Sequence, residues 1–388
     1  MARTQAIDHV LARAATAQDV PGVAATASFD GKVIYEGAFG RREVGKSAPM
    51  TIDTVGWIAS MTKAITGAAA MREVERGTLS LDAPAADVVP ELKRTQVLEG
   101  FDGAGRPKLR APRRPITLRN LLTHTSGFSY DIWSTEMCKY QAATDTPGIV
   151  SCQNKALTTP LLFDPGERWE YGIGIDWAGK MVEAASGQKL GAYMEQHIFA
   201  PLGMTSTSFK MTPSQRSRLA TVHARGADGQ LAPMAFEVPQ EPEFEMGGGG
   251  LYGTVQDYIK FTLMILNRGS YNGQQVLKPE TVQAMASNQM GDVNVADMKT
   301  AMPPYSNDVN LTAFGAAKWG LTFMINTETT PPGRSAGSLS WAGLANSYYW
   351  IDPKRSVTGV LMTQILPFFD KDAISLLGEF ESAVYGSL

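Results

Sequence analysis

A helix that must be covered by protein on every side constrains this fold most. Residues 60–77 are expected to form a helix whose middle, AITGAAAM (64–71), is apolar or small all round. A helix without a polar face is typical of a buried core position. The preceding residues, TVGWIA (54–59), are typical of a short extended piece. We therefore predict a central, buried helix that begins near Ser60 and ends near Gly77.

Strand-like runs at both ends of the chain indicate what surrounds this helix. Asp30-Gly31 separates two β-rich runs within residues 22–40, a strong hairpin signal. Three further strand-like runs lie at 319–327, 339–352 and 356–365, and helical patterns lie between the two ends. The predicted class is α/β of the α+β type, an antiparallel sheet flanked by helices with a mostly helical insertion. We predict that residues 1–75 and 231–388 form the sheet domain and 76–230 the helical domain.

Residues 40–47, GRREVGKS, match the spacing of a phosphate-binding loop. Such a loop needs small residues, so that backbone N–H groups can surround a phosphate, and a helix must begin at its Lys-Ser end. Three of the four free positions here are bulky and charged, and the residues after Ser47 do not continue as a helix. We interpret the segment as the loop that leaves the hairpin.

A second match, GRSAG at 333–337, has the G-x-S-x-G spacing of a nucleophile elbow. That elbow joins a strand to a helix, whereas Pro331 and Pro332 precede this serine and a strand-like run follows it. In that fold the histidine follows the serine, but all four histidines of this chain precede Ser335. Ser335 is therefore predicted to be a loop serine.

The third match is S-x-x-K, which occurs at Ser60–Lys63 and at Ser186–Lys189. The second pair contains Gly187 and lies where a helix stops, so its side chains need not share a face. Ser60 and Lys63 open the central helix, where positions i and i+3 are neighbours. The helix dipole and a desolvated setting disfavour the ammonium form of Lys63, which can then take the proton of Ser60. The alternative is a capping serine beside a surface lysine.

Five segments together resemble the serine β-lactamase-like hydrolases, which include class C β-lactamases, D-alanyl-D-alanine peptidases and family VIII carboxylesterases. The resemblance runs from about residue 20 to 365, and family VIII is the closest group. It implies a β-lactamase/transpeptidase-like fold. The segments are SMTK (60–63), LLTHTSGF (121–128), PGERWEYG (165–172), APLGMTST (200–207) and GGGGLYGTVQDYIKF (247–261).

The resemblance implies a catalytic serine, a lysine three residues later and a tyrosine from a Tyr-x-Asn motif. Ser60 and Lys63 match the first two, and Tyr171 matches the tyrosine, with Ile173 at the Asn position. Lys63 and Tyr171 would act together as general base and acid, and the sequence leaves open which of them holds the proton.

Further site residues are also implied by the resemblance. Similarity to family VIII esterases places the oxyanion hole at the backbone N–H groups of Ser60 and Leu344. His124 could pair with Ser60, although a structural role in its own loop is the stronger interpretation. The residues predicted to bind substrate are Trp341, Gly343, Phe128, Tyr130 and Trp133.

Two departures from the family pattern bear on the substrate. Trp341-Ala342-Gly343 replaces the Lys-Thr-Gly motif, so no lysine there can hold a substrate carboxylate. Ile173 offers no amide for an acylamino group. Both departures favour neutral esters, and the prediction is a carboxylesterase that forms an acyl-enzyme. The alternatives are a β-lactamase, D-peptidase or amide hydrolase of the same fold, an acyltransferase, or an inactive binding protein on this scaffold.

Charge and composition bound the partners. The net charge of −3 and the pI of about 5.9 give no electrostatic case for nucleic acid or an anionic membrane. We expect a small-molecule ester as partner and neither metal nor cofactor. Asp8 and Arg13 interrupt the apolar run that a signal peptide would need, so a cytoplasmic protein is expected. Cys138 and Cys152 could pair, but free thiols are favoured.

Overall fold

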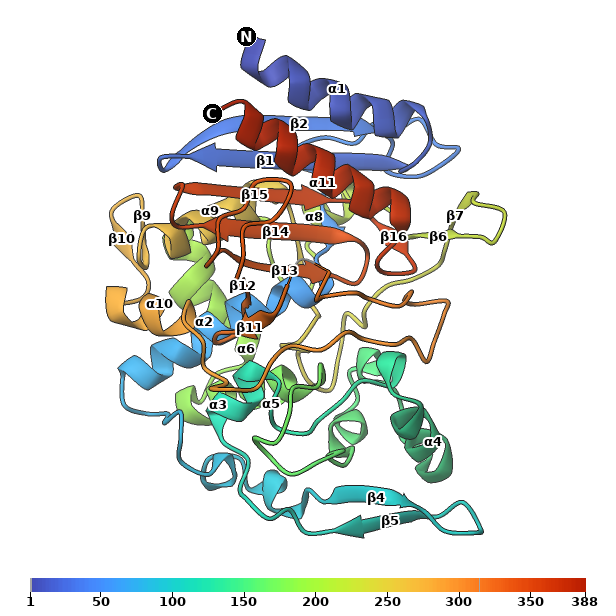
Figure 1. The fold of residues 1–388 in the computed structure, drawn as a ribbon, viewed down its shortest axis with the longest axis vertical. Helices are drawn as coiled ribbons and strands as arrows, with labels where there is room; N and C mark the ends of the chain where they lie inside the picture. Colours follow the sequence, from blue (N-terminus) through green and yellow to red (C-terminus); the bar gives the residue numbers. More distant parts are fainter. Residues whose placement is uncertain (1, 314) are drawn as a thin grey trace.

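A computed structural model describes residues 2–313 and 315–388 of the chain. Its core is a seven-stranded antiparallel sheet with the order β11-β12-β13-β14-β15-β1-β2 (Figure 1). The N-terminal hairpin β1–β2 pairs with β15, with Ala24 opposite Met362. The sheet predicted from both ends of the chain is therefore confirmed. The strands are β1 (Gly22–Phe29), β2 (Lys32–Gly40), β11 (Ala317–Trp319), β12 (Met324–Asn326), β13 (Leu339–Gly343), β14 (Ser347–Asp352) and β15 (Val357–Met362).

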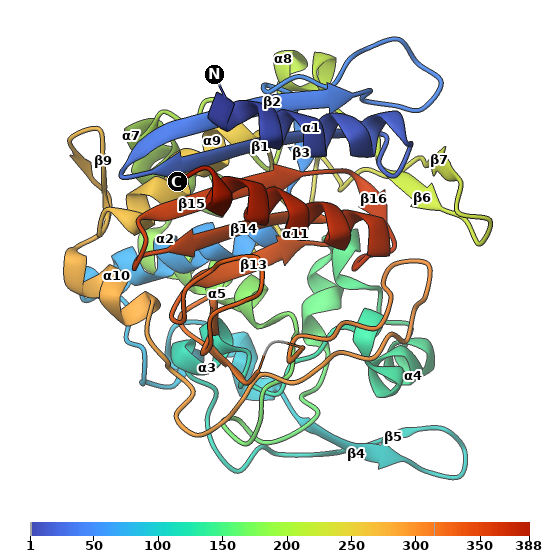
Figure 2. The same cartoon turned by 45° about the horizontal axis from the view of Figure 1, so that its top comes forward.

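Helices cover both faces of this sheet. They are α1 (Ala2–Thr16), α9 (Val255–Leu266) and α11 (Lys371–Gly386). Successive side chains of a strand point to opposite faces. In β14, Trp350 packs against Phe380 of α11 with ring centroids 5.6 Å apart. The adjacent Tyr349 packs against Tyr258 of α9 at 5.1 Å. Figure 2 shows α1 lying beside α11 over the same face of the sheet.

The predicted central helix is present and buried. It consists of a 3-10 turn, η1 (Ala59–Met61), followed by α2 (Thr62–Glu75). Every residue from Thr62 to Met71 is buried, as its small and apolar composition requires. Gly67 allows a close approach, because a Cβ there would lie 2.5 Å from the side chain of Thr322. The side of α2 away from the sheet packs against α5 (Gly174–Ser186).

The rest of the chain forms shorter elements, and the predicted division into two domains at residues 75 and 231 stays a prediction. The helices are α3 (Leu118–Thr123), α4 (Thr135–Thr144), α6 (Leu190–Met194), α7 (Ala200–Leu202), α8 (Pro213–Ser217) and α10 (Pro279–Met285). The strands are β3 (Gly56–Trp57), β4 (Val97–Phe101), β5 (Pro107–Arg110), β6 (His223–Arg225), β7 (Leu231–Pro233), β8 (Tyr252–Gly253), β9 (Ser270–Tyr271), β10 (Gln274–Gln275) and β16 (Ile365–Leu366).

Two of the motif matches lie in loops, as the sequence predicts. The phosphate-loop match begins at the end of β2, and a bridge between Arg41 and Pro49 closes the loop that follows. The next helical turn begins at Ala59, well beyond Ser47. Ser335 lies between β12 and β13, and its backbone N–H donates to the Asp352 carboxylate at 2.9 Å. Neither segment has the helix that its motif requires.

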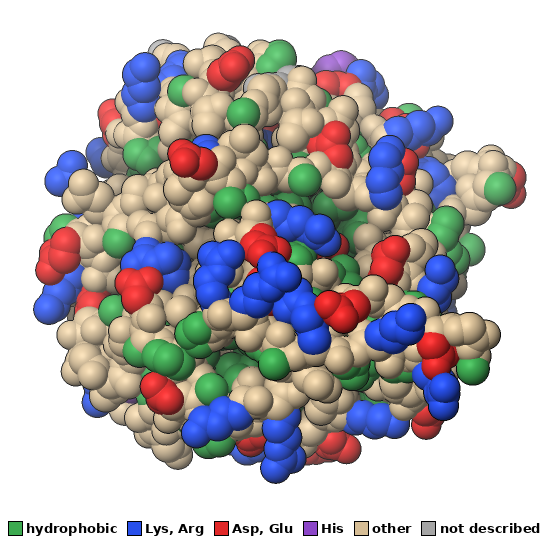
Figure 3. Space-filling view, turned by 60° about the horizontal axis from the view of Figure 1, so that its bottom comes forward, with side chains coloured by type: hydrophobic (Ala, Val, Ile, Leu, Met, Phe, Trp, Pro, Cys, Tyr) green, Lys and Arg blue, Asp and Glu red, His purple; other side chains and the backbone are tan. Residues whose placement is uncertain are grey.

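Charges on the surface are mixed in sign. On the face that Figure 3 turns forward, basic and acidic side chains are interspersed. Within the basic run 108–114, Arg110 forms an ion pair with Asp164 at 2.7 Å, and Arg114 lies 3.7 Å from Glu167. The run therefore has acidic partners of its own, which agrees with a solvated loop.

The structure also bears on cysteine pairing and on membrane-spanning helices. Cys138 and Cys152 are unpaired, and Cys152 is buried. The structure therefore shows the free thiols that the sequence favoured. In residues 2–313 and 315–388, no helix combines the length and apolar character that crossing a membrane would require.

Candidate active site

Ser60 and Lys63 lie side by side at the start of the central helix. Ser60 belongs to the η1 turn and Lys63 to the first turn of α2, and Ser60 Oγ lies 3.0 Å from Lys63 Nζ. The preceding residue, Ala59, has a positive φ of 45°. A left-handed backbone at a non-glycine residue costs about 1–3 kcal/mol and persists only where the surroundings impose it. The strained turn therefore fixes the direction in which the Ser60 side chain points.

Lys63 is a buried amine with three close oxygen neighbours. Its side chain is fully inaccessible to solvent. Besides Ser60, its Nζ donates to Tyr130 Oη at 2.9 Å and to the Gly248 carbonyl at 2.5 Å. Burial lowers the pKa of Lys63 to about 7, and the negative charge of Asp176 opposes this shift. Around neutral pH, Lys63 therefore exchanges its proton readily and can act as a base.

Tyr171 approaches the same pair from the loop before α5. Lys63 Nζ lies 4.7 Å from the centre of the Tyr171 ring. Burial raises the pKa of Tyr171, and hydrogen bonds with Ser60 and with Trp341 reduce this rise. The Trp341 indole donates to Tyr171 Oη at 2.9 Å. The phenol is therefore protonated at neutral pH, and Lys63 is the better base of the two.

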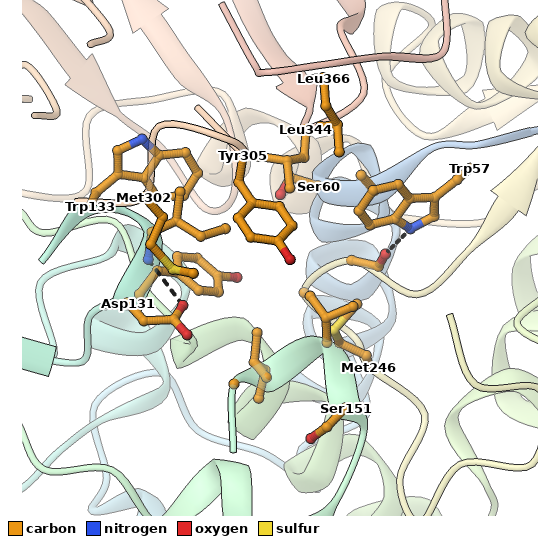
Figure 4. A pocket seen from close by; sticks show the side chains of 18 of the residues that line it. Trp57, Ser60, Asp131, Trp133, Ser151, Met246, Met302, Tyr305, Leu344 and Leu366 are labelled. Atoms are coloured by element: carbon orange, nitrogen blue, oxygen red, sulfur yellow. Dashed lines mark hydrogen bonds between the residues drawn. The ribbon is translucent and has the colours of Figure 1, made fainter. Parts of the chain in front are cut away.

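A cavity of about 330 Å³ opens over Ser60 (Figure 4). Leu344 lies next to Ser60 in its wall, and Tyr130 and Trp133 also line it. Asp131 is the one charged side chain among the described lining residues. The cavity is otherwise lined by Trp57, Ala59, Ile132, Gly148, Ile149, Val150, Ser151, Phe236, Met246, Gly248, Gly249, Met302, Tyr305 and Leu366.

Three residues predicted to bind substrate lie outside the lining of this cavity. Phe128 is buried and stacks on Trp177, with ring centroids 6.4 Å apart. Trp341 is not in the lining, and its indole N–H donates to the phenol oxygen of Tyr171. Gly343 packs against the nucleophile turn, and a Cβ there would lie 2.5 Å from the Ile58 carbonyl oxygen. These three residues support the site from behind.

His124 has the structural setting that the sequence favoured. It is buried at the end of α3, and its Nδ1 accepts a hydrogen bond from the Gly172 N–H at 3.4 Å. Its ring lies 4.7 Å from that of Tyr171. Burial, and then the nearby Lys63 charge, lower the pKa of His124 well below its usual value, so the ring is neutral. It packs behind Tyr171, and no described hydrogen bond joins it to Ser60.

The sequence interpretation missed two contributors to the site. Asp176 lies in the first turn of α5, and one of its carboxylate oxygens accepts from the Gly248 N–H at 2.8 Å. Gly248 belongs to the glycine run before β8 and presents its carbonyl to Lys63. An aspartate five residues after the predicted tyrosine was the available signal. This aspartate was not predicted as a site residue, because no local sequence pattern links it to Lys63.

The fold and the site together define a serine enzyme of the β-lactamase type. A family model for Beta-lactamase matches residues 7–378, and the chain belongs to that family. The chain is 33% identical to monacolin J acid methylbutanoyltransferase of Aspergillus terreus, over 96% of this chain and 93% of that protein. It is 32% identical to lovastatin esterase of Penicillium rubens, over 92% and 91%.

Solved structures agree with this assignment. Simvastatin synthase (LovD) from Aspergillus terreus, in its LovD6 mutant form, has a TM-score of 0.85 and 32% sequence identity, covering 98% of this chain and 96% of that chain. EstCE1, a hydrolase with promiscuous acyltransferase activity, has a TM-score of 0.78, with 98% of each chain covered. At 21% identity, EstCE1 supports the fold alone.

Proposed function

We propose that the protein is a carboxylesterase of the family VIII type that cleaves small neutral esters through an acyl-enzyme on Ser60. The observation that carries the proposal is the 3.0 Å contact between Ser60 Oγ and Lys63 Nζ at the wall of an apolar cavity. A hydroxyl next to a base of lowered pKa is an activated nucleophile. Similarity to lovastatin esterase supports the same chemistry.

Acylation starts when Lys63 takes the proton of Ser60. Ser60 Oγ attacks the ester carbonyl, and the carbonyl electrons move to oxygen to give a tetrahedral oxyanion. The backbone N–H groups of Ser60 and Leu344 stabilise it, each by about 3 kcal/mol. Within the described part of the chain, the Leu344 N–H donates no hydrogen bond to protein, which leaves it available.

The intermediate collapses with cleavage of the bond to the alcohol oxygen. That oxygen receives the proton of the Lys63 ammonium, either directly or through Tyr171, which gives up its own proton and takes the one from Lys63. Lys63 is then neutral again. Water then enters, Lys63 takes one of its protons, and hydroxide attacks the acyl carbon. Ser60 leaves with the returned proton, and a carboxylic acid is released.

The cavity supports neutral substrates. No lysine or arginine occurs among its described lining residues. A substrate carboxylate would therefore find no cation, and burial of an unpaired charge is costly. Ile173 is itself buried and offers no polar group. These features disfavour penicillins and cephalosporins, which carry a carboxylate.

A second candidate is acyl transfer to an alcohol. The acyl-enzyme is the same, and an alcohol replaces water in the second half. The methylbutanoyltransferase relative at 33% identity favours it, as does an apolar lining that binds water poorly. We also propose a cytoplasmic location, which the unpaired Cys138 and Cys152 support because free thiols are typical of a reducing compartment.

One set of assays tests both candidates. Turnover of p-nitrophenyl butyrate, with none of a chromogenic cephalosporin, is the expected result. Ser60→Ala should abolish turnover, whereas Ser335→Ala serves as the matched loop control and should keep it. Adding a primary alcohol, and measuring free butyrate against the butyrate ester of that alcohol, then separates hydrolysis from transfer. Equal losses in the two serine variants would show that the nucleophile is elsewhere.

A further inference from the structure

A buried carboxylate interacts electrostatically with Lys63, and one of its two oxygens has no described hydrogen-bond partner. Asp176 is 1% exposed. Its Oδ1 accepts from the Gly248 N–H at 2.8 Å, whereas its Oδ2 is buried and has no partner in the described part of the chain. An unsatisfied buried carboxylate oxygen is costly, so its retention calls for an explanation.

One residue connects this carboxylate to Lys63. Gly248 donates its N–H to Asp176 and accepts from Lys63 through its carbonyl. The connection needs glycine, because a Cβ at Gly248 would lie 2.6 Å from Asp176 Oδ2. Asp176 therefore holds the N–H side of a residue whose carbonyl, in the next peptide group, accepts from the amine.

The number of hydrogens on Lys63 explains why this matters. A neutral amine has two N–H groups and one lone pair. The Gly248 carbonyl can only accept, so it takes one N–H, and Tyr130 Oη takes the other. The lone pair is then left for the Ser60 hydroxyl, 3.0 Å away. If the Gly248 carbonyl turned away, nothing would hold the lone pair toward Ser60.

We propose that Asp176 is a positioning residue for Lys63: it holds the Gly248 carbonyl that orients the amine, and its charge stabilises the ammonium that forms when Ser60 loses its proton. This inference rests on the proposed function. Asp176 is not among the described residues that line the cavity, and no described hydrogen bond joins it to Ser60 or Lys63.

Other titratable groups around the pair stay neutral near neutral pH. Tyr130 and Tyr171 face Lys63 from two loops, and burial raises the pKa of both phenols. Burial also raises the pKa of the Cys152 thiol to about 12, and Asp176 adds to this shift. The pKa of His124 is lowered by burial. Asp176 and Lys63 are therefore the two groups whose charges respond to each other.

Titration of Lys63 tests the proposal without requiring turnover. The full-length protein is labelled with ¹³Cε-lysine, and the Lys63 signal is assigned by its loss in Lys63→Met. Asp176→Asn keeps an oxygen for the Gly248 N–H but removes the charge, so the pKa of Lys63 should fall by about one pH unit or more. Asp176→Glu restores the charge and should reverse much of this fall. An unchanged Lys63 titration in a folded Asp176→Asn protein would overturn the proposal.

A second readout follows the nucleophile. The rate at which a fluorophosphonate labels Ser60 is measured against pH by intact-protein mass spectrometry. Asp176→Asn should lower the maximal rate at least about tenfold and move the profile to lower pH. The matched control is Asp257→Asn, which alters a buried aspartate bonded to the Ser206 N–H at 2.7 Å and should leave the profile in place.

Two outcomes separate the inference from the proposed function. A wild-type protein that is never labelled would refute the activated Ser60, while the Lys63 titration would still decide the role of Asp176. If Asp176→Asn does not fold, Gly248→Ala replaces it, because its Cβ displaces the same carboxylate. If Lys63 titrates in a folded Gly248→Ala protein with the same pKa as in the wild type, the proposed link from Asp176 to Lys63 through Gly248 is contradicted.

Discussion

The indole N–H of Trp341 donates a 2.9 Å hydrogen bond to the phenol oxygen of Tyr171. The two rings also pack together, with centroids 5.0 Å apart. Trp341 lies on β13, at the position where the family resemblance places a lysine. The tryptophan at this position therefore cannot hold a substrate charge, and instead it holds the side chain of Tyr171, which we propose to be catalytic.

Trp341→Phe should lower kcat/KM for p-nitrophenyl butyrate about fivefold, because one hydrogen bond to Tyr171 is worth about 1 kcal/mol. Tyr171→Phe should lower kcat/KM at least about a hundredfold, since it removes the phenol that can pass a proton to the leaving alcohol. Trp319→Phe is the matched control. Its indole is also buried against Trp341 but has no hydrogen-bond partner among the described residues. Equal effects of Trp341→Phe and Trp319→Phe would mean that packing alone matters.

The pH dependence of kcat/KM should report Lys63. Burial disfavours its ammonium form and lowers its pKa to about 7, so the basic form predominates above that pH. Activity should therefore rise about tenfold per pH unit up to about pH 7 and then level off. Lys63→Arg should be inactive at every pH, because a guanidinium keeps its proton. A rate that increases on acidification would contradict a basic role for Lys63.

Gly343→Ala should destabilise the nucleophile turn. Its Cβ would lie 2.5 Å from the Ile58 carbonyl oxygen, a backbone atom that cannot yield without moving η1. We expect a loss of about 1–3 kcal/mol in the free energy of unfolding, as for other overpacked sites, and slower labelling of Ser60. Gly378→Ala is the control. Gly378 lies within helix α11, and a Cβ there would lie 3.9 Å from Pro332, its nearest described neighbour outside the helix backbone. That variant should gain up to about 1 kcal/mol in the free energy of unfolding. Denaturant unfolding of both variants measures these changes.

Charge on the acyl group should also decide reactivity. Asp131 is the one charged side chain among the described residues of the cavity, and no cation accompanies it there. The p-nitrophenyl ester of glutaric acid, which keeps one carboxylate, should react at least about tenfold more slowly than the uncharged valerate ester. Asp131→Asn should narrow this ratio by removing like-charge repulsion. A preference for the anionic ester would show that a cation reaches the substrate from outside the lining.

Local patterns in the sequence were enough for several parts of the protein. The small and apolar residues from Thr62 to Met71 predicted a buried helix, and Ser60 and Lys63 meet because i and i+3 positions share a helical face. The strand-like runs predicted the antiparallel sheet. The phosphate-loop and elbow matches were rejected because no helix was predicted after either segment. In each case the predictive pattern lies within one helix turn, one strand or one short motif, so the local sequence contains it.

The tertiary structure alone decided the contacts between distant segments. Tyr130 and Phe128 are two residues apart, yet one bonds to Lys63 and the other is buried away from the cavity. Asp176 reaches Lys63 through Gly248, which lies far along the chain. Such contacts depend on how α2, α5 and the glycine run pack together, and sequence spacing carries no record of that. The sequence therefore determined that Ser60 and Lys63 lie together at the start of the central helix, and packing determined how Lys63 is held.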